Sequence, residues 1–130
     1  MKYMLMMHTG QDVADGILNW DPEDVKAHMG FQHDFDDALK DSGELVFAEG
    51  LSFPDQARLV RSDGVSPAVT DGPFPESKEF LMGFWIVDCD SLDRALEIAA
   101  EASAAPGPGG VPLGIPIEVR PIMKAPAGDA

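Results

Sequence analysis

The three histidines of the chain are its first candidates for acid–base chemistry, because an imidazole gains and loses a proton near neutral pH. His33 falls in the middle of a segment with helical periodicity, where it could act as a general base or simply pair with Asp37 one turn later. His28 lies nearer the apolar side of that segment, where a hydrogen-bonded structural histidine is the commoner case. His8 ends an apolar N-terminal segment, and it would point into a cavity if that face of a strand encloses one.

Glu118 and Arg120 are the next candidates, near the C-terminus. Because strand side chains alternate, the two residues share one face of a predicted strand. A carboxylate buried there would need a partner, so a Glu118–Arg120 pair would be structural. Alternatively, the forked guanidinium of Arg120 would hold an anionic substrate. Both interpretations stay open on the sequence.

Motifs for metals and cofactors are missing from the sequence. The histidines do not occur at His-x-His, His-x-x-His or His-Glu-x-x-His spacing, so we predict no metal site. The Pro/Gly-rich segment 106–114 lacks the glycine patterns of nucleotide-binding loops, and we predict no cofactor. Cys89, the single cysteine, ends an apolar segment and is expected in the core rather than as a nucleophile.

The composition indicates one acidic domain. The 130 residues carry 9 Lys and Arg against 23 Asp and Glu, a net charge of −14, so we expect no binding to nucleic acid and none to anionic membranes. No apolar run approaches the roughly 20 residues that a membrane span needs. We therefore expect a cytoplasmic protein with one domain over residues 1–123 and a flexible tail over 124–130.

Periodicity and capping signals predict the order β-α-β-β-loop-β-α-β, with Asp21 and Pro22 starting the first helix and Ser91 starting the second. The predicted ranges are 2–8, 44–50, 57–61, 82–89 and 115–123 for the strands, 21–40 for the first helix, 9–20 and 104–114 for loops, and 76–81 for a helical turn. The positions expected on the buried face of the first helix are Val25, Met29, Phe35 and Leu39. This order predicts a ferredoxin-like α+β sandwich (βαββαβ), with both helices on one face of an antiparallel sheet.

Two predicted strands are apolar on both faces. The first places Leu5 on one side and Met4 on the other, and the strand at 82–89 behaves in the same way. A sheet face turned away from the helices normally meets water and is polar. A second copy of the chain is the simplest cover, so we predict a homodimer whose sheets pack face to face, as in dimeric α/β-barrel proteins. The alternative is that loops 9–20 and 51–80 fold over this face.

Several blocks along nearly the whole chain match a known pattern. The most specific is Asp71-Gly72-Pro73-Phe74, followed by Glu76-Ser77-Lys78-Glu79. The other blocks are Lys2-Tyr3-Met4-Leu5, Gly43-Glu44-Leu45-Val46, Glu49-Gly50-Leu51, Gly83-Phe84, Asp90-Ser91-Leu92-Asp93-Arg94-Ala95 and Ile117-Glu118-Val119-Arg120-Pro121. In these blocks the chain resembles the YCII-related family, and within it the DGPF branch. The resemblance implies a ferredoxin-like fold and a dimeric barrel, in agreement with the periodicity.

The resemblance also implies a histidine–aspartate pair in a cleft. Asp71 would be the carboxylate partner of His33, or of Gln32 if the helix histidine of the family falls one residue earlier. On its own, Asp71 could instead bond the backbone N–H groups of its turn. Phe74 would form the apolar wall of a pocket or anchor its loop.

We therefore predict that the protein binds a small molecule in an apolar cleft. If it is an enzyme, the resemblance to the family implies cofactor-free elimination or isomerisation of a small cyclic or aromatic substrate. His33 and Asp71 would be catalytic, and the substrate-binding residues would be His8, Phe74 and Arg120. The alternative is a non-enzymatic dimer that senses a ligand or binds a partner, linked to transcriptional regulation through a sigma factor, near which members of the DGPF branch often occur.

Overall fold

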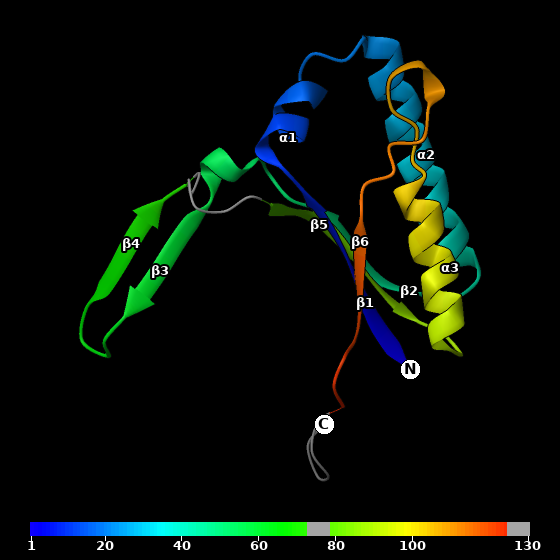
Figure 1. Ribbon diagram of the computed structural model, residues 1–130. Helices are drawn as coiled ribbons and strands as arrows, with labels where there is room; N and C mark the ends of the chain where they lie inside the picture. Colours follow the sequence, from blue (N-terminus) through cyan, green and yellow to red (C-terminus); the bar gives the residue numbers. More distant parts are fainter. Residues whose placement is uncertain (73–78, 125–130) are drawn as a thin grey trace.

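The computed structural model describes residues 1–72 and 79–124. Figure 1 shows a sheet backed on one side by two long helices, with a separate β-hairpin on the other side. Within the described residues, no helix has the length and apolarity needed to cross a membrane. In chain order the elements are β1 (Lys2–Thr9), α1 (Gln11–Ile17), α2 (Pro22–Asp41), β2 (Leu45–Gly50), a 3-10 turn (Pro54–Gln56), β3 (Arg58–Ser62), β4 (Pro67–Asp71), β5 (Phe80–Asp88), α3 (Leu92–Ser103), a second 3-10 turn (Pro108–Gly110) and β6 (Ile117–Pro121).

The main sheet is antiparallel and has the strand order β2-β5-β1-β6. Helix α2 lies between β1 and β2 in the chain, and α3 lies between β5 and β6. Each of these helices connects two strands that have a third strand between them, so the two β-α-β units interlock. Both helices pack on the same face of the sheet (Figure 1). This arrangement confirms the predicted ferredoxin-like sandwich.

The core lies between the sheet and the two helices. Leu5 of β1 and Val87 of β5 are completely buried there. Trp85 of β5 meets the ring of Phe35 edge-on, with ring centroids 5.7 Å apart. Its indole N–H donates a hydrogen bond of 2.9 Å to the Asp36 carboxylate. A buried indole needs such an acceptor, so this one polar contact together with apolar packing fixes α2 on the sheet.

Helix α2 begins as predicted, with Pro22 in its first turn. The prediction that Val25 and Met29 are buried is wrong, because they are 37% and 60% exposed. The first turns of α2 lie against the loop before β6 rather than against the sheet. There, His28 Nδ1 is 3.0 Å from the carbonyl oxygen of Pro106 in a hydrogen bond. Helical spacing predicted the repeat of the buried positions, but in the first turns of α2 the loop before β6 covers a different side of the helix.

Two other segments differ from their predicted structure. The predicted loop 9–20 contains the short helix α1. The predicted helical turn 76–81 is wrong at its end, because Phe80 and Leu81 pair with the last residues of β1 and start β5. Residues 76–78 lie outside the described residues, as does the predicted tail beyond Lys124. Ser91 caps α3 as predicted, since its hydroxyl accepts a hydrogen bond of 3.1 Å from the backbone N–H of Arg94.

Strands β3 and β4 form a hairpin apart from the main sheet, and residues 58–71 are called the arm below. Every residue of both strands is exposed. The base of the arm is closed by a hydrogen bond of 2.8 Å from the backbone N–H of Gly72 to the carbonyl oxygen of Ala57. Glycine is required there, because a Cβ would lie 2.6 Å from the carbonyl oxygen of Pro54. The arm therefore leaves the body of the protein from a closely packed base (Figure 1).

Candidate functional site

The sheet face opposite α2 and α3 is mostly apolar, and it is called the open face below. Its central residues face one another across the strands: Met6 of β1 lies opposite Phe84 of β5, and Met4 lies opposite Ile86. Phe47 of β2 extends this surface, with its ring centroid 5.9 Å from that of Phe84. The residues that define the open face are Met4, Met6, His8, Phe47, Glu49, Phe84, Ile86, Glu118 and Arg120.

His8 and Glu118 form an imidazole–carboxylate pair on this face. His8 Nε2 lies 3.1 Å from Glu118 Oε1, although the two residues are 110 positions apart in the sequence. Strands β1 and β6 are neighbours and Met6 lies opposite Glu118, so the diagonal position puts His8 beside the carboxylate. The His8 side chain is 29% exposed and that of Glu118 is 48% exposed. When Nε2–H donates to the carboxylate, Nδ1 of the neutral ring is the basic atom.

Arg120 lies beside this pair on the same strand as Glu118. Its Nε is 3.9 Å from Glu118 Oε2, a long separation, and its side chain is 71% exposed. The carboxylate of Glu118 therefore lies between an imidazole and a guanidinium. Within one protomer Arg120 is not in a buried structural pair, so most of its fork of N–H donors is available to an anion. His8, Glu118 and Arg120 together can hold a charged ligand group and move a proton beside an apolar surface.

His33 and Asp71 lie in different surroundings. His33 is on the exposed surface of α2, 77% exposed, with its Nδ1 3.2 Å from an oxygen of Asp37 one turn later. Asp71 ends β4 in the arm, where its carboxylate accepts from Arg58 Nε at 3.0 Å. In the part of the chain that the structure describes, no hydrogen bond or ion pair joins His33 to Asp71, and α2 and β4 lie on opposite sides of the sheet in Figure 1. Their role as a catalytic pair stays a prediction.

The remaining sequence candidates have simpler surroundings. His28 binds a backbone carbonyl and meets the Trp20 ring edge-on, at 5.6 Å between centroids, which is the structural role expected for it. Gln32, the alternative helix position, is half-buried. Cys89 is buried as expected, and burial raises the pKa of its thiol, so it is a poor nucleophile. Phe74 lies outside the described residues.

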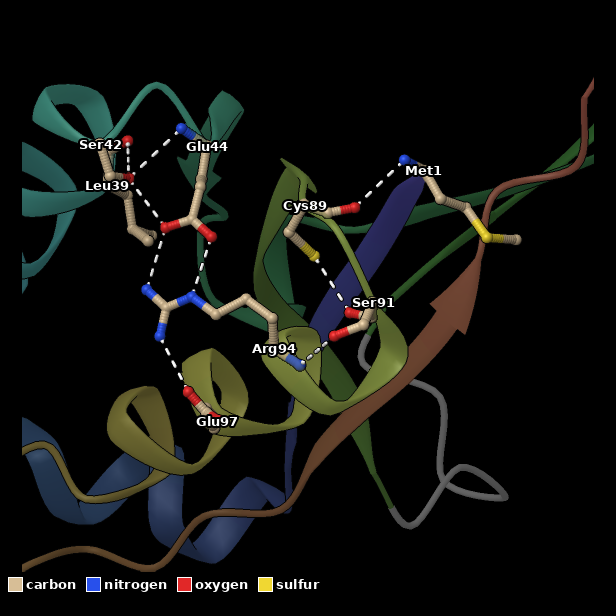
Figure 2. Close-up of polar contacts among 8 residues, drawn as sticks. All are labelled: Met1, Leu39, Ser42, Glu44, Cys89, Ser91, Arg94 and Glu97. Carbon is tan, nitrogen blue, oxygen red and sulfur yellow. Dashed lines mark hydrogen bonds and ion pairs between the residues drawn. The ribbon is translucent and has the colours of Figure 1, made fainter.

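A second charged cluster connects α2, β2 and α3 on the helix side of the sheet (Figure 2). Arg94 donates two hydrogen bonds to Glu44, each of 2.9 Å, and a third of 3.2 Å to Glu97. The Ser42 hydroxyl donates to Glu44 at 2.8 Å. These hydrogen bonds, those from Arg94 first, hold the pKa of the Glu44 carboxyl below its ordinary value, and Glu44 in turn raises the pKa of Arg94. The cluster is saturated by its own members, so we assign it a structural role.

A shallow hollow lies between α2 and the C-terminal end of α3. Its volume is about 350 Å³, and its floor is apolar. It is lined by Phe31, Asp34, Phe35, Ala38, Glu101 and Ala104. Among the described residues, no three His, Cys, Asp or Glu side chains lie together as a metal site would require.

Glu118 is the functional candidate whose contact with His8 the sequence did not predict. Both residues were placed on strand faces by their period of two, but they are at opposite ends of the chain. The predicted ferredoxin-like fold was the signal that could have found the contact, because the first and last strands of such a sheet are neighbours, as β1 and β6 are here.

Comparisons with known proteins bear on the whole chain. The chain is 30% identical to an uncharacterised protein of Rhizobium meliloti (strain 1021), over 99% of this chain and 98% of that protein. The protein-family model of the YCII-related domain matches residues 1–111. This match covers β1 to the second 3-10 turn, and it leaves the narrower DGPF branch a prediction. The chain belongs to the YCII-related family.

Proposed function

We propose that the open face binds a small anionic molecule with an apolar or aromatic body, and that His8 exchanges a proton with it. The observation that carries this proposal is the His8–Glu118 pair, 3.1 Å apart, beside the exposed guanidinium of Arg120 on an apolar sheet face. Pockets for small molecules combine this kind of apolar lining with a few convergent polar groups. The open face has both, and its members come from neighbouring strands, which are rigid supports.

The chemistry that fits these groups needs no cofactor. The guanidinium of Arg120 would hold a carboxylate or phenolate, and methionine and phenylalanine side chains would contact the rest of the ligand. His8 Nδ1 would take a proton from a carbon or oxygen next to the held group. Glu118 would keep the ring in the Nε2–H tautomer and stabilise the imidazolium that forms. Elimination or isomerisation of an enol, keto or hydroxylated aromatic acid is the reaction class that this set serves.

Covering the open face is part of the same proposal. One protomer leaves a surface of methionine, phenylalanine and isoleucine half-buried or exposed, with Phe47 at 49% exposure. A contiguous apolar surface of this kind is a mark of an interaction site. We propose that two sheets face each other in a homodimer and enclose the ligand between them, in a protein of the cytoplasm.

Thermal unfolding with a ligand panel tests the site. Salicylate and 4-hydroxyphenylpyruvate are suitable probes, because each combines an aromatic ring with a carboxylate. At a hundredfold excess over Kd, a native-state ligand adds roughly 2.7 kcal/mol to stability, a shift of several degrees. We expect wild type and His33→Gln to shift alike and Arg120→Gln to shift less. Equal shifts for Arg120→Gln and wild type would reject the site.

Proton exchange separates catalysis from binding. In D₂O, the wild type should catalyse exchange of the acidic C–H of a bound keto acid, followed by NMR, and His8→Gln should not. Loss of exchange in His33→Gln with retention in His8→Gln would instead support the His33–Asp71 assignment. Binding without exchange in any variant would leave a ligand sensor rather than an enzyme.

The hollow between α2 and α3 favours a second candidate, the binding of a basic partner. Asp34 and Glu101 flank its apolar floor, and α2 carries six carboxylates against two lysines. A basic amphipathic segment, such as one from a transcription regulator, would match this surface in charge and shape. Titration with a cationic amphipathic peptide tests it. Asp34→Asn/Glu101→Gln should weaken the binding several-fold and flatten its salt dependence, and unchanged binding would exclude the hollow.

A further inference from the structure

The arm has little packing of its own, since every residue of its two strands is exposed. Val60 of β3 lies opposite Val69 of β4, so their side chains share one face of the hairpin. They are 61% and 59% exposed, and Leu59 on the other face is 47% exposed. A two-stranded hairpin alone is marginally stable in water. This hairpin nevertheless extends from a fixed base with its apolar residues uncovered by the described part of the chain.

We propose that the arm packs on a second copy of this chain, beside the open face, so that each protomer's arm helps to enclose the other protomer's site. The proposal deepens the proposed function, since it rests on the open face being the surface where two copies meet. It assigns a role to the hairpin that the acid–base site itself does not require. Three observations carry it: the direction of the arm, the place of its base and its charge.

The direction of the arm is toward the open side of the sheet. Figure 1 shows the hairpin on the side away from α2 and α3. Its base lies at the His8 end of the open face, because His8 and Thr9 pair with Leu81 and Phe80 at the start of β5. The strand that precedes the arm ends there too, with the backbone N–H of Leu51 bonded to the carbonyl of Met82 at 2.9 Å. A second copy bound to the open face would therefore lie beside the arm and contact it.

The charge of the arm favours a second copy of the chain as the molecule that packs against it. The chain has a net charge of −14, but residues 58–71 contain two arginines and two aspartates and have none. Arg58 and Asp71 also pair with each other, at 3.0 Å. On the open face, Arg120 offsets one of the two carboxylates, Glu49 and Glu118. Two acidic chains repel less when they meet through such weakly charged surfaces than through their acidic helices.

Sedimentation equilibrium of the full chain, from 1 to 100 µM, tests the proposal. We expect the wild type to be a dimer and Val60→Ser/Val69→Ser to raise the dimer dissociation constant at least tenfold, with an unchanged far-ultraviolet circular dichroism spectrum. The matched control is Val65→Ser, at the arm's turn, which is 90% exposed. This variant should dimerise as the wild type does. A monomeric wild type at 100 µM, or a double variant that dimerises like the control, would overturn the proposal.

Phe47→Ser/Phe84→Ser separates the arm from the open face. If this variant dissociates and the arm variant does not, the face-to-face dimer stands and the role of the arm fails. If the arm variant dissociates and the face variant does not, the arm binds the second copy and the enclosed site fails. If the circular dichroism spectrum shows that the double variant of the arm does not fold, Val69→Thr replaces it. Threonine keeps the β-branched shape and removes apolar surface. For that variant we expect a smaller rise of the dissociation constant in the same direction.

Discussion

Two charged clusters of this protein contain nearly the same ingredients and differ in what is left over. On the helix side of the sheet, Glu44 accepts two hydrogen bonds from Arg94, each of 2.9 Å, and its side chain is 17% exposed. On the open face, Glu118 lies 3.9 Å from Arg120, whose side chain is 71% exposed. The first carboxylate and guanidinium saturate each other. The second pair leaves N–H donors of Arg120 and the imidazole of His8 available to a ligand.

The difference shows why an ion pair is not by itself a sign of function. A saturated, two-pronged pair stabilises the fold and has nothing to offer a ligand. An open pair on an apolar surface contributes little to stability, because water competes for both partners, but its donors are available to a ligand. Stability and ligand affinity should therefore respond to mutations of the two arginines in opposite ways.

The largest effect is expected from Arg94→Gln. This change removes charged hydrogen bonds from a carboxylate that is mostly shielded from water, and it should lower the free energy of unfolding by about 2 kcal/mol. Arg120→Gln should change it by less than about 0.5 kcal/mol. Urea denaturation followed by tryptophan fluorescence measures both. Equal losses of stability would show that Arg120 is also structural, as in the interface pair considered from the sequence.

Ligand affinity should reverse this order. For whichever probe of the panel binds, Arg120→Gln should weaken binding about tenfold, which corresponds to about 1.4 kcal/mol. Arg94→Gln should bind like the wild type at a temperature where both are folded. Isothermal titration calorimetry gives the two constants directly. Normal affinity in Arg120→Gln would remove the guanidinium from the site and leave His8 without an anion holder beside it.

The sequence predicted the fold better than the site, for a physical reason. Alternation and helix caps are local signals, so the strands, the start of α2 and the cap of α3 followed from nearby residues. The His8–Glu118 contact depends on β1 and β6 being neighbours, which no local pattern encodes. His33 was a candidate because it lies in the middle of a helical segment and because the family resemblance implies a helix histidine. The structure shows the simpler alternative, a surface pair with Asp37 one turn later.

The pH dependence of stability tests the saturated cluster more finely. Its hydrogen bonds to Arg94 lower the pKa of Glu44 in the folded protein relative to the unfolded chain. A carboxyl with a lowered folded pKa stabilises the protein above its unfolded pKa, near 4.5, and the stabilisation is lost as the pH falls through the folded pKa. Glu44→Gln should therefore reduce the stability difference between pH 6 and pH 3. Glu118→Gln is the matched control and should retain more of this stability difference. If the stability of Glu44→Gln depended on pH as strongly as that of the wild type, a group other than Glu44 would cause the dependence.

The smallest effect is expected from His33→Gln, and it decides between the two imidazole–carboxylate pairs. The His33–Asp37 distance of 3.2 Å is nearly the same as the 3.1 Å of His8–Glu118, so distance alone does not rank them. The His33 pair is local and 77% exposed at the histidine, and pairs of this spacing contribute roughly 0.3 kcal/mol to a helix. His33→Gln should therefore stay within about 0.5 kcal/mol of the wild type in stability, with ligand affinity unchanged within experimental error. A large loss of affinity with normal stability would mean that α2 rather than the open face carries the site, as the predicted catalytic role of His33 requires.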